Sequence, residues 1–131
     1  MNSEGKLLAK LLGLSQERFS PKGEDILLGN GDDAAVIQFG DSRVALSCDA
    51  LVEDIHFSTK YCSFEDIGFK AIESTASDLL AVGAYPKYFL VSLSIPSVIS
   101  NDSLEQLYKG MAESLERLDA SVIGGDITQS S

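Results

Sequence analysis

Residues 31–57 read GDDAAVIQFGDSRVALSCDALVEDIHF. Two short apolar runs, 34–39 and 43–48, are each joined to an acidic cluster, and Gly40-Asp41-Ser42 between them is a turn signal. The pattern predicts a strand, a tight turn and a second strand, whose ends bring the two acidic clusters together. Carboxylates at close range repel unless a cation or protons lie between them, so this stretch predicts a site for a hard metal ion.

The segments that flank this stretch on both sides predict helices. The leucines of residues 3–12 recur on one helical face and Gly13 is a stop signal, whereas 14–30 reads as a loop. Ser63 is placed to cap a helix that runs to about Val82, with acidic residues in its first turn.

The C-terminal third predicts a strand, a helix and a last short strand. Apolar and polar residues alternate over 88–95, the pattern of a half-buried strand. Asn101-Asp102-Ser103 offers a cap for an amphipathic helix through Leu118, and 120–123 is an apolar strand that ends in a Gly124-Gly125-Asp126 turn. This order of elements indicates an α+β fold with a mixed β-sheet flanked by helices. A functional turn so close to the last residue leads us to expect a fragment of a longer protein.

The composition favours one folded, acidic domain. A length of 131 residues suits a single domain, and 44% apolar residues suffice for a core. A net charge of −10 argues against nucleic acid and anionic membrane as partners, and it means that phosphates would have to be handled through metal ions. Neither a secretory start nor a run of the ~20 apolar residues of a membrane span is present. Cys48 and Cys62 lack metal-ligand spacing, so we expect reduced thiols in the cytoplasm.

Five acidic residues stand beside predicted turns or element ends. Mg²⁺ prefers a few carboxylates, keeps some of its waters and is completed by substrate phosphates, so five carboxylates in one cleft would hold more than one ion. Asp is also common in caps and turns, which is the simpler explanation for any one of them. The five are Asp32, Asp33, Asp49, Asp78 and Asp126.

Other phosphate-binding motifs do not occur in the sequence. It has neither a Gly-x-x-x-x-Gly-Lys-Ser/Thr loop nor a Gly-x-Gly-x-x-Gly after a strand, and Arg43 is the one basic residue within 31–57. If the chain binds ATP, cations must neutralise its phosphates, with added donors from the backbone of Gly124 and Gly125.

Two further side chains could contact a ligand. His56, the single histidine, is open to roles as general base, metal ligand, substrate contact or hydrogen-bonded loop residue. Tyr108 could stack on a nucleotide base or pack as a rim aromatic.

Four segments, in this order, resemble the thiamine-monophosphate kinase family. That family belongs to an ATP-binding superfamily with aminoimidazole ribonucleotide synthetase, formylglycinamidine ribonucleotide amidotransferase and selenophosphate synthetase. The resemblance covers the chain from about Gly29 to its end, and the first two segments are fairly specific to the thiamine-monophosphate branch. The segments are 31–36 (GDDAAV), 49–57 (DALVEDIHF), 77–86 (SDLLAVGAYP) and 124–128 (GGDIT).

The resemblance implies a synthetase N-terminal-domain-like fold that transfers the ATP γ-phosphate to thiamine monophosphate, giving thiamine diphosphate. It also implies several Mg²⁺ ions and a homodimer that shares a barrel-like sheet. The implied magnesium residues are Asp33, Ser47, Asp49, Asp78 and Asp126, together with Cys48, which stands where the family usually has Thr and would act through its carbonyl. Gly125 and Asp126 match the nucleotide-binding turn, and His56 matches a contact to the thiamine phosphate.

The chain departs from the family pattern in several places. Thr75 stands where the family usually has Asn, and Cys48 lacks a Thr hydroxyl. The family carries a second α/β domain after Gly-Gly-Asp, with further substrate and metal residues. We therefore expect residues 1–131 to be a single N-terminal ATP- and Mg-binding domain that dimerises and binds nucleotide weakly, without turnover on its own.

Two alternatives stay open. One is a related ATP-dependent synthetase of purine or selenium metabolism, although residues 1–30 contain no Cys of the kind expected in a selenophosphate synthetase. The other is a non-catalytic, metal-binding dimerisation domain in which the acidic turns are structural.

Overall fold

The computed structural model describes residues 3–14 and 23–130. The chain divides into two compact units, residues 1–47 and residues 48–131. The α+β class is confirmed, with the strands divided between one antiparallel and one parallel sheet. The expectation of a single N-terminal domain stays a prediction. Among the described helices, none is both long and apolar enough to cross a membrane.

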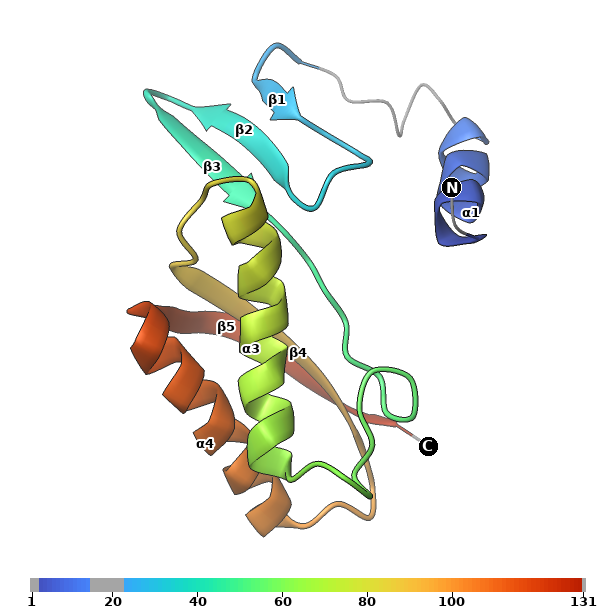
Figure 1. Cartoon of the computed structure of the whole chain (residues 1–131), viewed down its shortest axis with the longest axis vertical. Coiled ribbons are helices and arrows are strands. Elements are labelled where there is room, and N and C mark those ends of the chain that lie inside the picture. The colour runs from blue at the N-terminus through green and yellow to red at the C-terminus, as the bar shows by residue number, and fades with distance from the viewer. Residues whose placement is uncertain (1–2, 15–22, 131) are drawn as a thin grey trace. The chain divides into compact units, whose positions relative to one another are not determined.

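The first unit contains α1 and a three-stranded antiparallel sheet (Figure 1). The predicted hairpin is confirmed: Phe39 pairs with Ser42 across the Gly40-Asp41 turn, and Gly40 has a φ of 60°, which glycine adopts without strain. The prediction of an unbroken loop over 14–30 was wrong within the described residues, because β1 lies inside it. A three-residue strand is too short for periodicity to reveal. The elements are α1 (Ser3–Gly13), β1 (Ile26–Leu28), β2 (Ala35–Phe39) and β3 (Ser42–Leu46).

The second unit consists of two helices and a two-stranded parallel sheet. Figure 1 shows α3 and α4 side by side on one face of this sheet. Its elements are α3 (Phe64–Ala81), β4 (Tyr88–Pro96), α4 (Asn101–Leu118) and β5 (Ser121–Ser130).

Both helices of the second unit begin at a serine cap. Ser63 caps α3 as predicted and forms a capping box with Asp66, in which each residue accepts a hydrogen bond from the backbone N–H of the other. For α4 the predicted cap was wrong by one residue. Ser100 holds that position and accepts from the Ser103 N–H at 3.1 Å, so the chain is already helical at Asn101.

The last strand is longer than the sequence predicted. Gly124-Gly125-Asp126 does not form a turn after a short strand; it lies inside β5 and pairs with Leu90, Val91 and Ser92 of β4. The register shifts between Phe89 and Leu90, where β5 contains one extra residue, Ile123. A Cβ on Gly125 would lie 1.9 Å from the Val91 carbonyl oxygen, so the close approach of the two strands requires glycine there.

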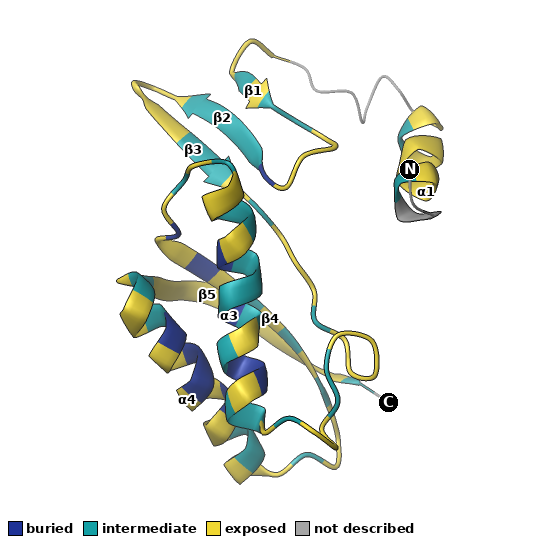
Figure 2. Ribbon diagram, viewed as in Figure 1, coloured by how far each residue is buried: buried dark blue, intermediate teal, exposed yellow. Residues whose placement is uncertain are grey.

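The core of the second unit lies between the two helices and β4. Every second side chain of β4 is exposed, beginning with Tyr88, and the side chains between them, beginning with Phe89, are buried or half-buried. This alternation was predicted for a half-buried strand. Figure 2 shows buried residues on α3, α4 and β4. The buried apolar cluster comprises Ile67, Ile72, Ala76, Phe89, Leu107 and Met111.

Candidate functional site

In the second unit, the segment that precedes α3 contains a tight loop that carries His56. The backbone N–H of His56 donates to the Val52 carbonyl at 2.9 Å, and the Asp54 N–H donates to the Phe57 carbonyl at 2.7 Å. Asp54 has a φ of 61°, a left-handed conformation that Asp tolerates better than most residues. The loop is therefore a defined structure with its own hydrogen bonds.

The His56 ring is fixed by the same loop. Its Nδ1 accepts a hydrogen bond from the Val52 backbone N–H at 2.9 Å, although the residue is exposed. Lys70 on α3 donates from Nζ to the His56 carbonyl oxygen, which ties the loop to the helix. The neighbouring Phe57 packs against the buried apolar cluster. His56 thus projects from a loop that is attached to α3 through Lys70 and to the core through Phe57.

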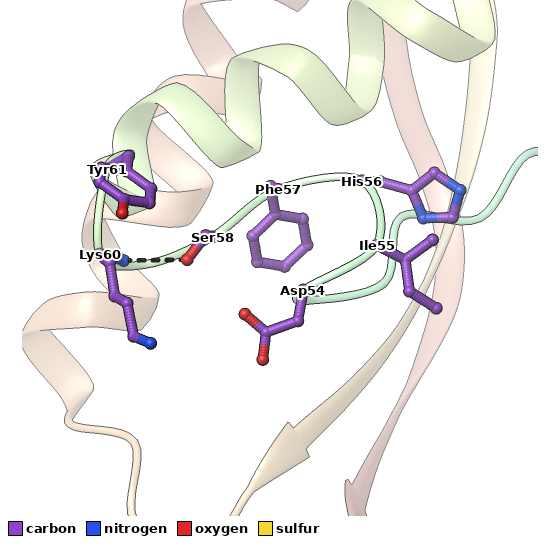
Figure 3. Close-up of a pocket in the computed structure, with 7 residues that line it drawn as sticks. All are labelled: Asp54, Ile55, His56, Phe57, Ser58, Lys60 and Tyr61. Atoms are coloured by element: carbon purple, nitrogen blue, oxygen red, sulfur yellow. Dashed lines mark hydrogen bonds between the residues drawn. The ribbon is translucent and has the colours of Figure 1, made fainter.

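A pocket of about 420 Å³ opens along this loop. Figure 3 shows Asp54 and Lys60 on one side of the loop, with Phe57 and Ser58 between them, whereas His56 and Ile55 lie at its other end. The lining is mixed in charge, with one carboxylate, one ammonium group and one imidazole. Its residues are Asp54, Ile55, His56, Phe57, Ser58, Lys60 and Tyr61. Such a pocket can accept a polar, charged ligand together with a small apolar surface.

In the first unit, the hairpin brings two predicted metal residues together. Asp33 precedes β2 and Ser47 follows β3, and the Ser47 hydroxyl donates to the Asp33 carbonyl at 3.2 Å. Asp32 folds back to accept from the Asp33 N–H at 2.9 Å. Both carboxylates are exposed, so they are accessible to an ion.

In the second unit, the remaining predicted residues occupy different elements. Cys48 and Asp49 are exposed in the segment before the His56 loop, and Asp49 accepts from the Ala50 N–H at 2.8 Å. Asp78 is half-buried near the end of α3. Asp126 is exposed on β5 beside Ser92, and Tyr108 of α4 is 43% exposed.

The chemistry of these donors fits Mg²⁺. Asp carboxylates and a Ser hydroxyl supply the hard oxygens that this ion prefers, whereas the Cys48 thiol is soft and could contribute through its carbonyl only. Within residues 3–14 and 23–130, no three His, Cys, Asp or Glu side chains gather into a group that could hold a metal ion. That these residues bind Mg²⁺ stays a prediction.

Sequence reasoning missed Lys70, which contacts His56, and Lys60, which lines the other side of the pocket. Lys70 is 14 residues from His56 and reads as an ordinary exposed helix position, so no local pattern connects the two. Lys60 falls in an irregular segment with no motif. The sequence therefore carried no signal for the contact between Lys70 and His56.

Comparison with protein families matches residues 31–131 to the model described as AIR synthase related protein, N-terminal domain. The chain is 41% identical over 100 residues to the thiamine-monophosphate kinase of Bacillus subtilis (strain 168). It is 39% identical over 102 residues to the thiamine-monophosphate kinase of Mycobacterium tuberculosis (strain ATCC 25618 / H37Rv). These matches cover 76% and 78% of the chain but 31% of each relative, so the chain spans about a third of the length of these curated relatives.

Solved structures agree with this similarity. The structure described as AaThiL complexed with AMPPCP and TMP superposes with a TM-score of 0.81 at 29% identity, over 100% of this chain and 40% of that chain. The structure of tt0281 from Thermus thermophilus gives a TM-score of 0.77 at 30% identity, over 98% of this chain and 40% of that one. The resemblance found in the four sequence segments is therefore confirmed.

Proposed function

The chain belongs to the family of AIR synthase related proteins, N-terminal domain, and from this we propose that it is the N-terminal part of a thiamine-monophosphate kinase. Such an enzyme transfers the γ-phosphate of ATP to thiamine monophosphate and forms thiamine diphosphate. The observation that carries the proposal is the similarity, over the whole chain, to a structure described as complexed with AMPPCP and TMP.

In phosphoryl transfer, a protein mainly has to position the two substrates and neutralise the charge of the phosphate groups. Phosphoryl transfer needs no side-chain nucleophile, and electrostatic stabilisation of the phosphate oxygens supplies most of the effect. Bound Mg²⁺ ions would supply that positive charge in a chain whose own net charge is −10. The residues proposed to hold them are Asp33, Ser47, Asp49, Asp78, Asp126 and the carbonyl of Cys48.

The nucleotide and the acceptor would use separate residues of the second unit. Gly125 allows a close backbone approach on β5, and Asp126 next to it is exposed. Tyr108 presents part of its ring to solvent and would stack on the adenine base. His56, fixed at the pocket of about 420 Å³, would contact the thiamine phosphate.

We further propose that the chain forms a homodimer through the β4–β5 sheet and works in the cytoplasm. A two-stranded sheet is marginal by itself. Leu90 is 74% exposed and Ile123 is 63% exposed on these strands, which supports a partner that covers them. The free thiols of Cys48 and Cys62 agree with a reducing compartment.

The test of catalysis uses a chimera that joins residues 1–131 to the C-terminal two-thirds of the Bacillus subtilis kinase. Mg²⁺-dependent consumption of ATP is measured with thiamine monophosphate, and with formylglycinamidine ribonucleotide as the competing acceptor. Formation of thiamine diphosphate without release of free phosphate supports the kinase. Activity with the ribonucleotide alone would instead identify a synthetase of the same superfamily.

A second test uses the 131-residue chain itself. Thermal unfolding is followed with Mg²⁺ alone, with AMPPCP alone and with both, because a ligand that binds only the folded state raises its stability. The proposal expects a larger shift with both ligands than with either one. Indifference to the nucleotide would point to a non-catalytic, metal-binding dimerisation domain and would overturn the proposal.

A further inference from the structure

The hydrogen bond at Nδ1 determines which nitrogen of His56 carries the hydrogen. A backbone N–H can only donate, so Nδ1, which lies 2.9 Å from the Val52 nitrogen, must accept with its lone pair. The neutral ring then carries its hydrogen on Nε2. A flipped ring would place a carbon atom opposite the Val52 N–H and lose this bond, so the ring orientation and the tautomer are set together.

This tautomer limits what the ring can do for a ligand. Nε2–H donates a hydrogen bond outward, whereas a general base or a metal ligand needs a lone pair at the accessible nitrogen. Because His56 is exposed at the end of a pocket, its Nε2–H is available to an acceptor atom of a bound molecule.

Lys70 holds the backbone of the same residue. Its ammonium group donates to the His56 carbonyl, and the His56 N–H in turn donates to the Val52 carbonyl at 2.9 Å. The Val52 N–H donates to Nδ1 of the His56 side chain, so two hydrogen bonds join Val52 and His56. Loss of the Lys70 side chain would therefore leave the His56 carbonyl without this hydrogen bond, while Phe57 stayed packed against the buried apolar cluster.

The charged groups around the loop comprise two ammonium groups and two carboxylates. Lys60 lines the pocket, and Lys70 lies beside the His56 backbone. Of the two nearby carboxylates, Glu53 already accepts from the Thr59 hydroxyl, and Asp54 lines the pocket on the same side as Lys60. These charges balance, so the fixed Nε2–H donor is what the loop offers an acceptor atom, and a phosphate oxygen can accept such a hydrogen bond.

We propose that the contact between His56 and the bound acceptor is a hydrogen bond donated by Nε2–H, and that Lys70 is the positioning residue that keeps the ring in this orientation. The proposal rests on the proposed function for the identity of the acceptor. The assignment of the tautomer and the role of Lys70 depend on this chain alone.

The first experiment examines the tautomer without any activity. Because the chain contains a single histidine, ¹⁵N-histidine labelling of the 131-residue protein gives one pair of ring signals. In buffer alkaline enough for a neutral imidazole, we expect a pyridine-like Nδ1 signal and a pyrrole-like Nε2 signal. Averaged shifts, or the opposite pattern, would overturn the proposal.

The second experiment adds ligand and varies Lys70. Thiamine monophosphate should shift the Nε2 signal, inorganic phosphate should shift it in the same direction, and thiamine without phosphate should leave it in place. Lys70→Met should average the ring shifts, whereas Lys70→Arg, which keeps a cationic donor, should restore them. Lys109→Met serves as the matched control, because Lys109 lies on α4 and its ammonium group pairs with Glu65 at 3.1 Å. Equal effects of Lys70→Met and Lys109→Met would overturn the positioning role.

In the chimeric kinase, Lys70→Met should raise KM for thiamine monophosphate about ten- to a hundredfold, the range expected for a hydrogen bond to a charged group. KM for ATP should stay within about twofold. A fall in kcat with both KM values unchanged would contradict the donor role. A chimera without kinase activity would reject the proposed function, whereas the ¹⁵N result would still decide the tautomer.

Discussion

Gly68 of α3 and Gly110 of α4 lie where each helix touches the backbone of the other. A Cβ on Gly68 would lie 1.9 Å from the Leu107 carbonyl oxygen, and one on Gly110 would lie 1.8 Å from the Glu65 carbonyl oxygen. Both contacts are far shorter than van der Waals distance. The separation of the two helices is therefore set by the absence of two side chains, and the buried apolar cluster is built on that separation.

Replacing either glycine by alanine should destabilise the second unit. Overpacking costs about 1–3 kcal/mol, more than the ~1 kcal/mol that alanine gains over glycine in a helix. Urea denaturation of Gly68→Ala and Gly110→Ala measures this loss. Gly13→Ala is the control and should be neutral or slightly stabilising, because an added Cβ would meet no atom of the described residues within 4 Å outside its chain neighbours and its own helix backbone. Wild-type stability in both core variants would show that the helices can separate at little cost.

Ser114 should contribute to stability through a buried hydrogen bond. It is 0% exposed, and its hydroxyl donates to a Glu73 carboxylate oxygen at 2.6 Å, while Arg117 pairs with the same carboxylate at 3.2 Å. Ser114→Ala leaves a half-buried carboxylate with one donor fewer, which should cost about 1–3 kcal/mol.

The matched control is Ser74→Ala. Ser74 is half-buried on α3 and bonds only weakly, at 3.4 Å, to a carbonyl of its own helix. Its loss should change the free energy of unfolding by less than about 0.5 kcal/mol. Similar losses in the two variants would mean that the bond between α3 and α4 adds nothing beyond the burial of a small side chain.

The capping box of α3 should make stability depend on acidic pH. Hydrogen bonds from the Ser63 hydroxyl and then from the Ser63 backbone N–H lower the pKa of Asp66 below its usual value of 3.8. A carboxyl with a lowered pKa in the folded state adds stability that is present above its unfolded pKa and is lost as pH falls through the folded value. The window therefore lies below about pH 4.

The variant Asp66→Asn tests this linkage. Thermal unfolding is compared at about pH 7 and at about pH 3 for the wild type and for the variant. The wild type should lose more stability than the variant on acidification, because only the wild type has this carboxylate to protonate. Equal losses of stability in the two proteins would show that Asp66 does not contribute to the pH dependence of stability.

Asp78 should matter for the binding of Mg²⁺. In the chimeric kinase, Asp78→Asn should raise the Mg²⁺ concentration for half-maximal activity at least about tenfold, because an amide replaces an anionic ligand. Asp102→Asn, in the first turn of α4, is the matched control and should leave the Mg²⁺ dependence unchanged. An unaltered Mg²⁺ titration for Asp78→Asn would end its assignment as a metal ligand.

Periodicity in the sequence predicted those elements whose pattern is local. The Ser63 cap, the alternation in β4 and the hairpin turn at Gly40 each depend on neighbours along the chain, and each is confirmed. The course of β5 could not be predicted in this way. Gly124-Gly125 reads as a turn, and only the close pairing with Val91 makes two glycines suitable inside a strand.

The candidate site was predictable to a similar extent. Residue types and a family resemblance pointed to the acidic positions and to His56, and the structure adds the Ser47–Asp33 contact at the hairpin end. The hydrogen bond from Lys70 to His56 could not be predicted from the sequence. Its acceptor is a backbone carbonyl, which every residue has, so the residue type at position 56 does not indicate the contact.

The parallel pairing of β4 with β5 has a consequence during synthesis of the chain. Tyr88 pairs with Ser121, and the pairing continues to Pro96 and Ser130. Among the described elements, β5 is the one strand that pairs with β4. Because α4 lies between these strands in the sequence, it must be synthesised before they can pair. On the ribosome, the unpaired edge of β4 stays open until α4 and β5 have both been added. An exposed apolar strand in that interval is a target for chaperones and for association with other nascent chains.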